Sequence, residues 1–137
     1  MKRTQQLRIK SDADLLSEVL QWFEQLYHPS IPQRTWLECQ TALAEGFINV
    51  VRHAHRGYPP ETPVQIEVSI QDQGLEIKIW DQGPGFNLEQ RLQKAKQNNS
   101  EQNTSGRGLL IMHDIMDFLD YSRTPEGQNC LTLIKQY

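Results

Sequence analysis

The sequence predicts a single domain built from both helices and strands, and three observations support this. Residues 12–27 and 33–55 repeat apolar side chains at the spacing of an amphipathic helix. Residues 64–70 and 75–79 alternate apolar and polar side chains on either side of a short turn, as the two strands of a hairpin do. The chain has 137 residues, the size of one domain, and shows no internal repeat or linker. We therefore expect one domain over residues 1–137.

Local patterns predict the elements at the start of the chain. Residues 4–9 alternate weakly between polar and apolar side chains, which predicts an edge strand. The helix expected over residues 12–27 can be capped by Ser11 or Asp12, whose side chains can accept a hydrogen bond from its first turn. Two prolines within residues 28–32 then end it.

The helix expected over residues 33–55 has an apolar side and a polar side. At about 100° per residue, its apolar side chains gather on one side: Leu43, Phe47, Val50 and Ala54. Glu45, Asn49 and His53 fall on the other side, within about 80° of one another. This polar trio therefore forms a compact stripe that faces away from the expected core.

The second strand of the expected hairpin ends in an unusual residue. Its inward positions are occupied by Leu75, Ile77 and Ile79. Asp81 has the same parity, so it takes the next inward position at the end of an apolar face. A carboxylate in such a place needs polar partners, because burying an unpaired charge is costly.

The C-terminal half is expected to contain two helices and two strands. We predict a short helix over residues 88–96 and an apolar helix over residues 109–119. Residues 97–105 are rich in Asn, Ser and Gln and contain no hydrophobic residue, which predicts a mobile loop. Residues 118–121 and 130–137 supply the last strands, joined by a turn that contains a proline and a glycine.

Composition argues against several classes of protein. The net charge of −3 disfavours non-specific binding to nucleic acid. No apolar run approaches the roughly 18–20 residues of a membrane span, and no apolar stretch follows Met1 as it would in a signal peptide. Cys39 and Cys130 belong to no metal or redox motif. We expect both to be reduced, buried thiols in a cytoplasmic protein.

Glu45 and Asn49, one helical turn apart, are the first candidates for chemistry. The Asn side-chain oxygen can bind Mg²⁺, whose other ligands would be water and phosphate oxygens. The Glu carboxylate can accept a proton from an attacking hydroxyl or water. The alternative is a solvated polar helix face, which is commoner on an arbitrary helix. His53 and His55 diverge by about 200° on a helix, which disfavours a metal ion shared between them.

The second candidate is the segment Asp81-Gln-Gly83-Pro-Gly85-Phe86. A buried Asp81 carboxylate can pair with the exocyclic amine of adenine. Gly83 and Gly85 lack side chains, so the backbone there can approach a flat ligand closely. The alternative is a strand-ending aspartate in an ordinary turn.

The third candidate is Ser105-Gly106-Arg107-Gly108-Leu109, which opens the apolar helix. Backbone N–H groups at a helix start and the Arg107 guanidinium both attract phosphate oxygens. A glycine-rich hinge is the alternative. The chain contains no P-loop sequence, and the pair Gly83-x-Gly85 lacks the third glycine of the Rossmann dinucleotide fingerprint.

The order and spacing of the three segments resemble those of the anti-sigma factor serine/threonine kinases. These are small members of the Bergerat-fold (GHKL) ATPase superfamily, which has a histidine-kinase-like ATPase domain. The resemblance covers residues 38–137. It implies an α/β (α+β) two-layer sandwich in which helices cover one face of a mixed, mostly antiparallel sheet. It also implies ATP and Mg²⁺ as cofactors, with an ATP lid at about residues 87–105.

The resemblance also implies a role for each segment. Glu45 would be the catalytic base and Asn49 the Mg²⁺ ligand. Asp81 would read the adenine, with Gly83 and Gly85 shaping that wall of the site. The phosphates would be held by residues at the start of the apolar helix: Gly106, Arg107, Gly108 and Leu109.

The first segment ends in His53, which by the resemblance would lie near the phosphates or have a structural role. The chain departs from the family at two places. It has His53-Ala-His55 where an aromatic residue often stands. It has Gln128 and Asn129 after the glycine of the last hairpin, where many members have a small hydroxyl residue. We expect the rim of the site to differ accordingly.

The function that the resemblance implies is a partner switch. Family members typically phosphorylate a serine or threonine of a small anti-anti-sigma (STAS-type) protein, and hold an RNA polymerase sigma factor inactive, usually as a homodimer. We therefore expect an ATP-dependent protein serine/threonine kinase that acts as an anti-sigma factor. It would bind a sigma factor or another transcription regulator, without direct contact to nucleic acid or a membrane.

Three other functions are compatible with parts of the pattern. A non-catalytic, nucleotide-sensing module that sequesters a regulator would not need the base at Glu45. A stand-alone histidine kinase catalytic domain is expected to follow a helical hairpin with a phospho-acceptor histidine. A hydrolase of the gyrase or MutL type needs a transducer domain, and the sequence ends at Tyr137. The kinase is therefore the leading hypothesis.

Overall fold

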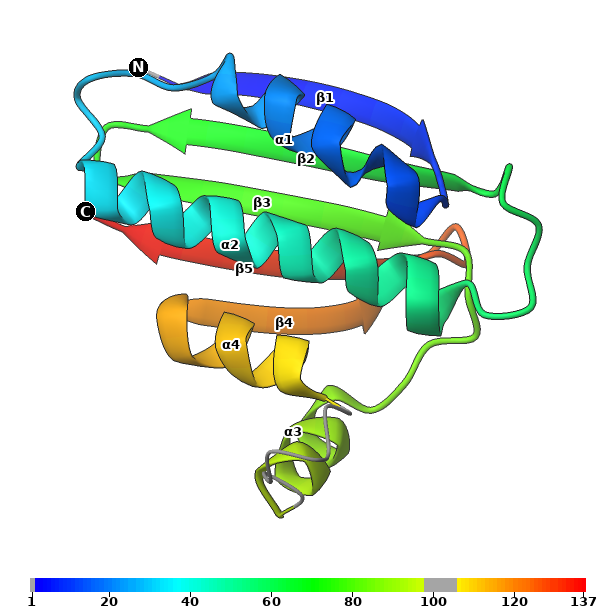
Figure 1. Ribbon diagram of the computed structural model, residues 1–137. Helices are drawn as coiled ribbons and strands as arrows, with labels where there is room; N and C mark the ends of the chain where they lie inside the picture. Colours follow the sequence, from blue (N-terminus) through cyan, green and yellow to red (C-terminus); the bar gives the residue numbers. More distant parts are fainter. Residues whose placement is uncertain (1, 98–105) are drawn as a thin grey trace.

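The structure is a computed structural model that describes residues 2–97 and 106–137. In these residues five strands form one sheet, and helices cover one of its faces (Figure 1). The strand order is β1-β2-β3-β5-β4, and each neighbouring pair is antiparallel. The strands are β1 (Arg3–Lys10), β2 (Pro63–Gln71), β3 (Gly74–Asp81), β4 (Phe118–Arg123) and β5 (Asn129–Gln136). The predicted two-layer sandwich is confirmed, as is the edge position of the first strand.

The helical layer consists of α-helices and two short turns of other helix types. A 3₁₀ turn and a π-helical turn flank the first two α-helices. The helical elements are η1 (Ala13–Leu15), α1 (Leu16–Glu24), α2 (Gln33–Asn49), η2 (Val50–Ala54), α3 (Leu88–Gln97) and α4 (Arg107–Ile115). In Figure 1, α1, α2 and α4 lie in front of the sheet, whereas α3 lies apart from it below α4.

The core lies between the sheet and the helices. It forms because buried apolar residues alternate with more exposed residues along the strands. Val64, Ile66 and Val68 of β2 are almost completely buried, while the two residues between them are half-buried on the other face. Gly46 of α2 packs against β3. A Cβ atom there would lie 2.6 Å from Cδ1 of Ile79, so a larger residue would force the end of the Ile79 side chain to shift.

The sheet register brings distant segments together at one end of the molecule. Asp81, the last residue of β3, pairs with Asn129, the first residue of β5. At this same end α2 finishes and α4 begins (Figure 1). The three segments singled out in the sequence therefore meet around one edge of the sandwich.

The first two predicted helices differ from the structure in detail. The helix expected over residues 12–27 begins with a 3₁₀ turn, which Asp12 caps by accepting a hydrogen bond from the Asp14 N–H at 2.9 Å. Its α-helical part ends at Glu24. The helix expected over residues 33–55 changes to π-helical geometry after Asn49, where the His55 N–H donates to the Val50 carbonyl oxygen at 2.8 Å.

The prediction of a helix over residues 109–119 was wrong at its end. Helix α4 finishes at Ile115, and Met116 is already extended. The Asp117 N–H donates to the carbonyl oxygen of Ile134 at 2.9 Å, so the chain joins the sheet at that point. Apolar periodicity could not show this stop, because Phe118 and Leu119 belong to β4 rather than to the helix.

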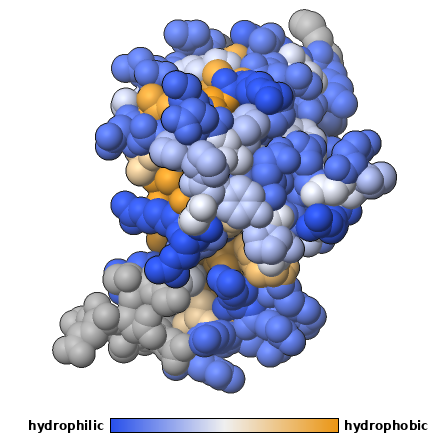
Figure 2. Space-filling model, turned by 90° about the vertical axis from the view of Figure 1, so that its right-hand side faces the viewer, coloured by the Kyte–Doolittle hydropathy of each residue, from blue (hydrophilic) through white to orange (hydrophobic). Residues whose placement is uncertain are grey.

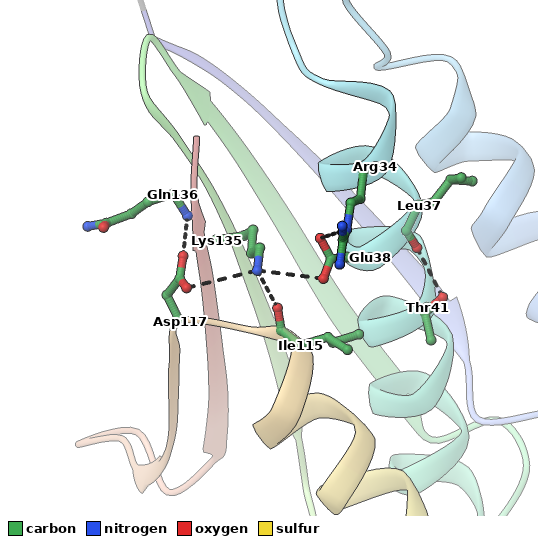
Figure 3. Close-up of polar contacts among 8 residues, drawn as sticks. All are labelled: Arg34, Leu37, Glu38, Thr41, Ile115, Asp117, Lys135 and Gln136. Atoms are coloured by element: carbon green, nitrogen blue, oxygen red, sulfur yellow. Dashed lines mark hydrogen bonds and ion pairs between the residues drawn. The ribbon is translucent and has the colours of Figure 1, made fainter.

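A lysine holds the C-terminal end of α4 in place (Figure 3). The Lys135 ammonium donates to the carbonyl oxygen of Ile115 at 2.7 Å, and lies 3.7 Å from a Glu38 carboxylate oxygen and 3.9 Å from one of Asp117. Lys135 comes from β5 and Glu38 from α2, while Asp117 immediately precedes β4. One side chain thus links α2, α4, β5 and the residue before β4, on the side of the molecule away from the three segments.

Other expectations have mixed outcomes. Cys39 and Cys130 are buried and free, and burial raises the pKa of the Cys39 thiol to about 12. Among the residues that the structure describes, no helix is long and apolar enough to cross a bilayer. The loop expected over residues 97–105 falls outside the described residues, except for Gln97, which is the last residue of α3.

Candidate functional site

A polar pocket of about 160 Å³ lies between the end of α2 with the following turn η2, helix α3 and the start of α4. Asn49 and His53 of the first segment and Gly106 and Leu109 of the third segment line it. Helix α3 contributes the remaining lining residues: Arg91, Lys94 and Ala95. Two cationic side chains beside a helix N-terminus favour a negatively charged ligand such as phosphate.

Glycines at the start of α4 allow this pocket to form. Gly106 has a φ of +78°, a backbone conformation that other residues rarely adopt, and a Cβ atom there would lie 2.7 Å from Cβ of Ala95. At Gly108, a Cβ atom would lie 2.7 Å from Oε2 of Glu45. The half-buried Glu45 carboxylate therefore rests directly against the first turn of α4.

The Asp81 carboxylate lies at the centre of a hydrogen-bond network. It is only 1% exposed. Its Oδ1 accepts hydrogen bonds from the Gly83 N–H at 2.8 Å and from Nδ2 of Asn129 at 2.9 Å. Its Oδ2 accepts a hydrogen bond from the Tyr121 hydroxyl at 2.8 Å. These three donors stabilise a charge that would otherwise be costly to bury.

The two glycines after Asp81 are required by close packing. A Cβ atom at Gly83 would overlap the carbonyl oxygen of Ala54, where η2 ends. At Gly85, where φ is +83°, a Cβ atom would lie 2.8 Å from Oδ1 of Asn129. Asn129 also donates through Nδ2 to the Gly83 carbonyl oxygen at 2.8 Å. In this structure both glycines therefore pack against other residues of the protein, at the positions where the sequence predicted the close approach of a flat ligand.

An aromatic stack connects Asp81 to α3. The ring of Phe86 lies parallel to that of Tyr121, with the centroids 4.3 Å apart and the planes inclined by 19°. The Arg91 guanidinium lies over the Phe86 ring, 4.9 Å from its centroid. The contacts run continuously from the Asp81 carboxylate through two rings to a cation that lines the polar pocket.

His55, which the sequence left without a role, is a structural residue. Its ring is buried, and Nε2 accepts a hydrogen bond from the Gln82 N–H at 2.8 Å. Nδ1 therefore carries the proton of the neutral ring and donates it to Oγ of Ser11 at 3.0 Å. Burial lowers the pKa of His55, which favours this neutral form, although the nearby Asp81 carboxylate opposes the shift.

His53 has different surroundings. It is exposed at the mouth of the polar pocket. Partial burial, followed by the positive charges of Arg91, Arg56 and Arg52, lowers the pKa of its imidazole. The ring is consequently favoured as a neutral group near the pocket, where it can accept or donate one hydrogen bond.

The structure brings the predicted site residues into two neighbouring groups. Asn49, His53, Gly106 and Leu109 line the polar pocket. Glu45 lies beside it against Gly108. The second group is centred on the carboxylate at the end of β3: Asp81, Gly83 and Gly85. Arg107, the first residue of α4, is exposed and does not line the pocket.

Sequence reasoning assigned no role to four residues of this site. Arg91 and Lys94 were treated only as part of a short helix, although their positive charge near a phosphate-binding segment was a usable signal. Phe86 belongs to the second segment but was given no role, and Tyr121 gave no signal, because their contact depends on how the sheet places β4 relative to the end of β3. Asn129 was noticed as a departure from the family, and the structure shows that its amide binds Asp81.

The donor set suits a magnesium nucleotide. Among the described residues, no group of three or more His, Cys, Asp or Glu side chains could hold a metal ion. A Mg²⁺ ion does not need such a cage, because it usually takes one or two protein oxygens and completes its shell with phosphate and water. The half-buried Asn49 amide beside Arg91 and Lys94 offers that combination.

Figure 2 views the end of the molecule where β3 finishes and α4 begins. Its surface is mostly hydrophilic. Hydrophobic atoms reach the surface in patches in the upper part of this view and at the narrow waist above its lowest part (Figure 2). Helix α3 lies lowest in Figure 1, so the patch at the waist lies where α3 meets the rest of the domain.

Comparison with known proteins agrees with this architecture. The family model described as a histidine kinase-like ATPase domain matches residues 9–135. The Anti-sigma F factor of Oceanobacillus iheyensis is 28% identical over 100 residues, which cover 72% of this chain and 68% of that protein. The Anti-sigma F factor of Bacillus cytotoxicus is 33% identical over 81 residues, which cover 58% of this chain and only 55% of that protein.

A solved structure is similar in fold. It is described as the crystal structure of the SiaB–SiaC complex from Pseudomonas aeruginosa, and one of its chains matches with a TM-score of 0.61 at 12% identity. The match covers 97% of this chain and 89% of that one. At this identity the likeness concerns the fold alone.

Proposed function

Because the chain belongs to the histidine kinase-like ATPase domain family, we propose that it is an ATP-dependent protein serine/threonine kinase that acts as an anti-sigma factor. Membership of this family implies ATP binding. The observation that carries the kinase proposal is the position of Glu45, whose carboxylate lies against Gly108 beside the pocket that Asn49 lines. A carboxylate at this point can serve a reaction at the terminal phosphate.

Each residue has a distinct task in this proposal. Glu45 accepts the proton of the substrate hydroxyl as that oxygen attacks the γ-phosphorus of ATP, and the bond from this phosphorus to the bridging oxygen breaks to release ADP. Asn49 would hold Mg²⁺ through its side-chain oxygen, and the ion would supply charge neutralisation for the phosphates. Arg91 and Lys94 place two further positive charges beside the phosphate chain. Asp81 accepts a hydrogen bond from the adenine amine.

The residues at the start of α4 complete the phosphate site. The first N–H groups of an α-helix have no partner within the helix, so those of α4 can donate to phosphate oxygens. Gly106 and Gly108 keep this turn open, since a side chain at either position would collide with Ala95 or with Glu45. Arg107, exposed beside this turn, can reach a bound phosphate or a partner's surface.

The names of the similar proteins support the regulatory part of the proposal. The two similar proteins from Oceanobacillus iheyensis and Bacillus cytotoxicus are both named Anti-sigma F factor. We propose that this chain holds a sigma factor, or another transcription regulator, inactive. We also propose that it forms a homodimer and phosphorylates a serine or threonine of an anti-anti-sigma (STAS-type) protein. Phosphorylation would then decide which of the two partners remains bound.

The first test removes only the basicity of Glu45. Glu45→Gln keeps the shape of the side chain but cannot take a proton. We expect phosphate transfer from γ-labelled ATP to a captured partner to fall by at least about a hundredfold, which is the lower end of what a general base contributes. Nucleotide affinity should change only a fewfold. Undiminished transfer in this variant would contradict the role of Glu45.

The second test uses the partners of the native protein. Proteins that co-purify with the tagged chain are incubated with Mg²⁺ and γ-labelled ATP, and the label is mapped. Label on a serine or threonine of a small co-purified protein supports the kinase and identifies its substrate. Bound partners without label, despite measurable ATP binding, would instead support a non-catalytic, nucleotide-sensing module that works by sequestration.

A further inference from the structure

The Asp81 carboxylate is closed to a ligand in this structure. Both hydrogen bonds to Oδ1 come from the protein, one from Gly83 and one from Asn129. Oδ2 is covered by the Tyr121 hydroxyl at 2.8 Å, and the whole residue is only 1% exposed. An adenine amine therefore cannot reach this carboxylate until a side chain that covers it moves.

The size of the polar pocket leads to the same requirement. Pockets for small-molecule ligands usually measure about 300–1,000 Å³. The pocket lined by Asn49 and Gly106 measures about 160 Å³. It suits a phosphate group and is too small for a complete nucleotide. The base must therefore be held outside this pocket, next to Asp81 if that carboxylate receives it.

Tyr121 is the covering residue best able to move. Asn129 is 2% exposed and donates to both Asp81 and the Gly83 carbonyl oxygen, so its displacement would break two buried hydrogen bonds. Tyr121 is half-buried and makes a single hydrogen bond to Asp81. Its ring lies flat against Phe86, and a stacked pair of flat rings marks a space that a planar base could take over.

We propose that Tyr121 occupies the adenine position in the nucleotide-free protein, and that its displacement by the base sets the affinity for adenine nucleotides. This inference rests on the proposed function, because it assumes that Asp81 receives the base. Displacement of Tyr121 also disturbs its stack with Phe86, on which Arg91 of α3 lies. Binding of the base is thereby coupled to the helix that carries two cations of the phosphate pocket.

The test removes the competing hydroxyl and keeps the ring. Tyr121→Phe loses the hydrogen bond to Asp81 but can still stack on Phe86. We measure calorimetric binding of the Mg²⁺ complex of the β,γ-imido analogue of ATP to the full chain. Affinity should rise about tenfold, because hydrogen bonds to charged groups contribute at least that factor when they must be broken for binding.

Two controls separate the base site from the phosphate pocket. Mg²⁺ tripolyphosphate has no base, so its affinity should be the same in Tyr121→Phe and in the wild type, which also shows that the variant is folded. Tyr137→Phe removes a hydroxyl that donates to the Gln71 carbonyl oxygen, remote from Asp81, and should bind the ATP analogue as the wild type does.

Several results would overturn the inference. Unchanged affinity for the ATP analogue in Tyr121→Phe would show that the hydroxyl does not compete with the base. Weaker binding would show that it helps to hold the nucleotide. An equal gain for tripolyphosphate would place the effect in the phosphate pocket. If the wild-type protein binds tripolyphosphate but not the ATP analogue or ATP itself, it is the proposed function that fails, and the inference fails with it.

Discussion

At the residue scale, His55 shows how one buried side chain joins distant parts of the chain. Its two ring nitrogens bond Ser11 after β1 and Gln82 after β3, and the ring of Tyr58 lies 5.6 Å away in a stacked arrangement. The neutral ring uses one nitrogen as acceptor and the other as donor, so both bonds depend on its charge. Protonation would convert the acceptor nitrogen into a donor that faces the Gln82 N–H.

This dependence predicts a loss of stability in mild acid. An unfolded histidine titrates near pH ~6.5, whereas burial holds the pKa of His55 lower in the folded protein. The unfolded chain therefore takes up the proton first as the pH falls. The contribution of His55 is fully present above about pH 6.5 and is lost as the pH falls from there through the lowered folded-state value.

The measurement is urea denaturation between about pH 7.5 and about pH 5.5. His55→Gln can retain an acceptor and a donor but cannot titrate, so its free energy of unfolding should fall less steeply with pH than that of the wild type. His113→Gln is the control, since that ring lies at the surface. Parallel slopes for His55→Gln and the wild type would show that His55 does not carry the pH dependence.

At the element scale, the placement of α4 depends on both of its ends. Gly108 brings the first turn against Glu45, and Lys135 bonds the last carbonyl group at Ile115 (Figure 3). The same lysine lies near Glu38 of α2, so it connects α4 to the helix that carries Glu45 and Asn49. A cation at a helix C-terminus is also favoured by the helix dipole.

We expect Lys135→Met to lower the free energy of unfolding by about 1–3 kcal/mol, because the variant leaves the Ile115 carbonyl and two carboxylates without this donor. Lys78→Met is the matched control on the open sheet face, where Lys78 pairs only loosely with Glu76 at 3.8 Å and is partly exposed. It should change stability by no more than about 0.5 kcal/mol. If urea denaturation shows that Lys135→Met and Lys78→Met lower the free energy of unfolding equally, the contacts of Lys135 do not contribute more than those of Lys78.

At the scale of the whole molecule, the candidate site is assembled from elements of both layers. Glu45 and Asn49 come from α2, Asp81 from the end of β3, and Gly106 and Gly108 from the start of α4. Unfolding of the domain separates all of them. A nucleotide that binds only the assembled site must therefore stabilise the whole domain.

Mass action gives the size of this effect. At a nucleotide concentration of about 100 Kd, the Mg²⁺ complex of the non-hydrolysable ATP analogue should raise the free energy of unfolding by about 2.7 kcal/mol. The rise is measured as a shift of Tm with ligand concentration. Asn49→Ala, whose Tm without ligand shows whether it is folded, should give a smaller shift at the same concentration. No shift in the wild type at saturating nucleotide would contradict binding to the folded site.

Patterns with a short period were predictable from the sequence. The alternation along residues 64–70 and 75–79 identified both strands of the hairpin and placed Asp81 on the inward face. The spacing of Glu45 and Asn49 placed both on one side of a helix. In the structure Asn49 lines the polar pocket, and Glu45 lies beside that pocket against Gly108. These features depend on the geometry of a few consecutive residues, which is the same in any strand or helix.

Features that depend on neighbours distant in sequence required the tertiary structure. The end of α4 at Ile115 follows from the hydrogen bond between Asp117 and Ile134, and not from any break in apolar periodicity. The change to π-helical geometry after Asn49 likewise had no signal in the apolar pattern.

The sequence alone determined the class of fold and pointed to three segments for the candidate site, because residue type and local spacing suffice for both. Only the tertiary structure decided what surrounds Asp81. Tyr121 and Asn129 reach it because β5 lies between β3 and β4 in the sheet, an order that differs from the order along the chain. Strand order results from the packing of the whole core, and a local pattern carries no information about it.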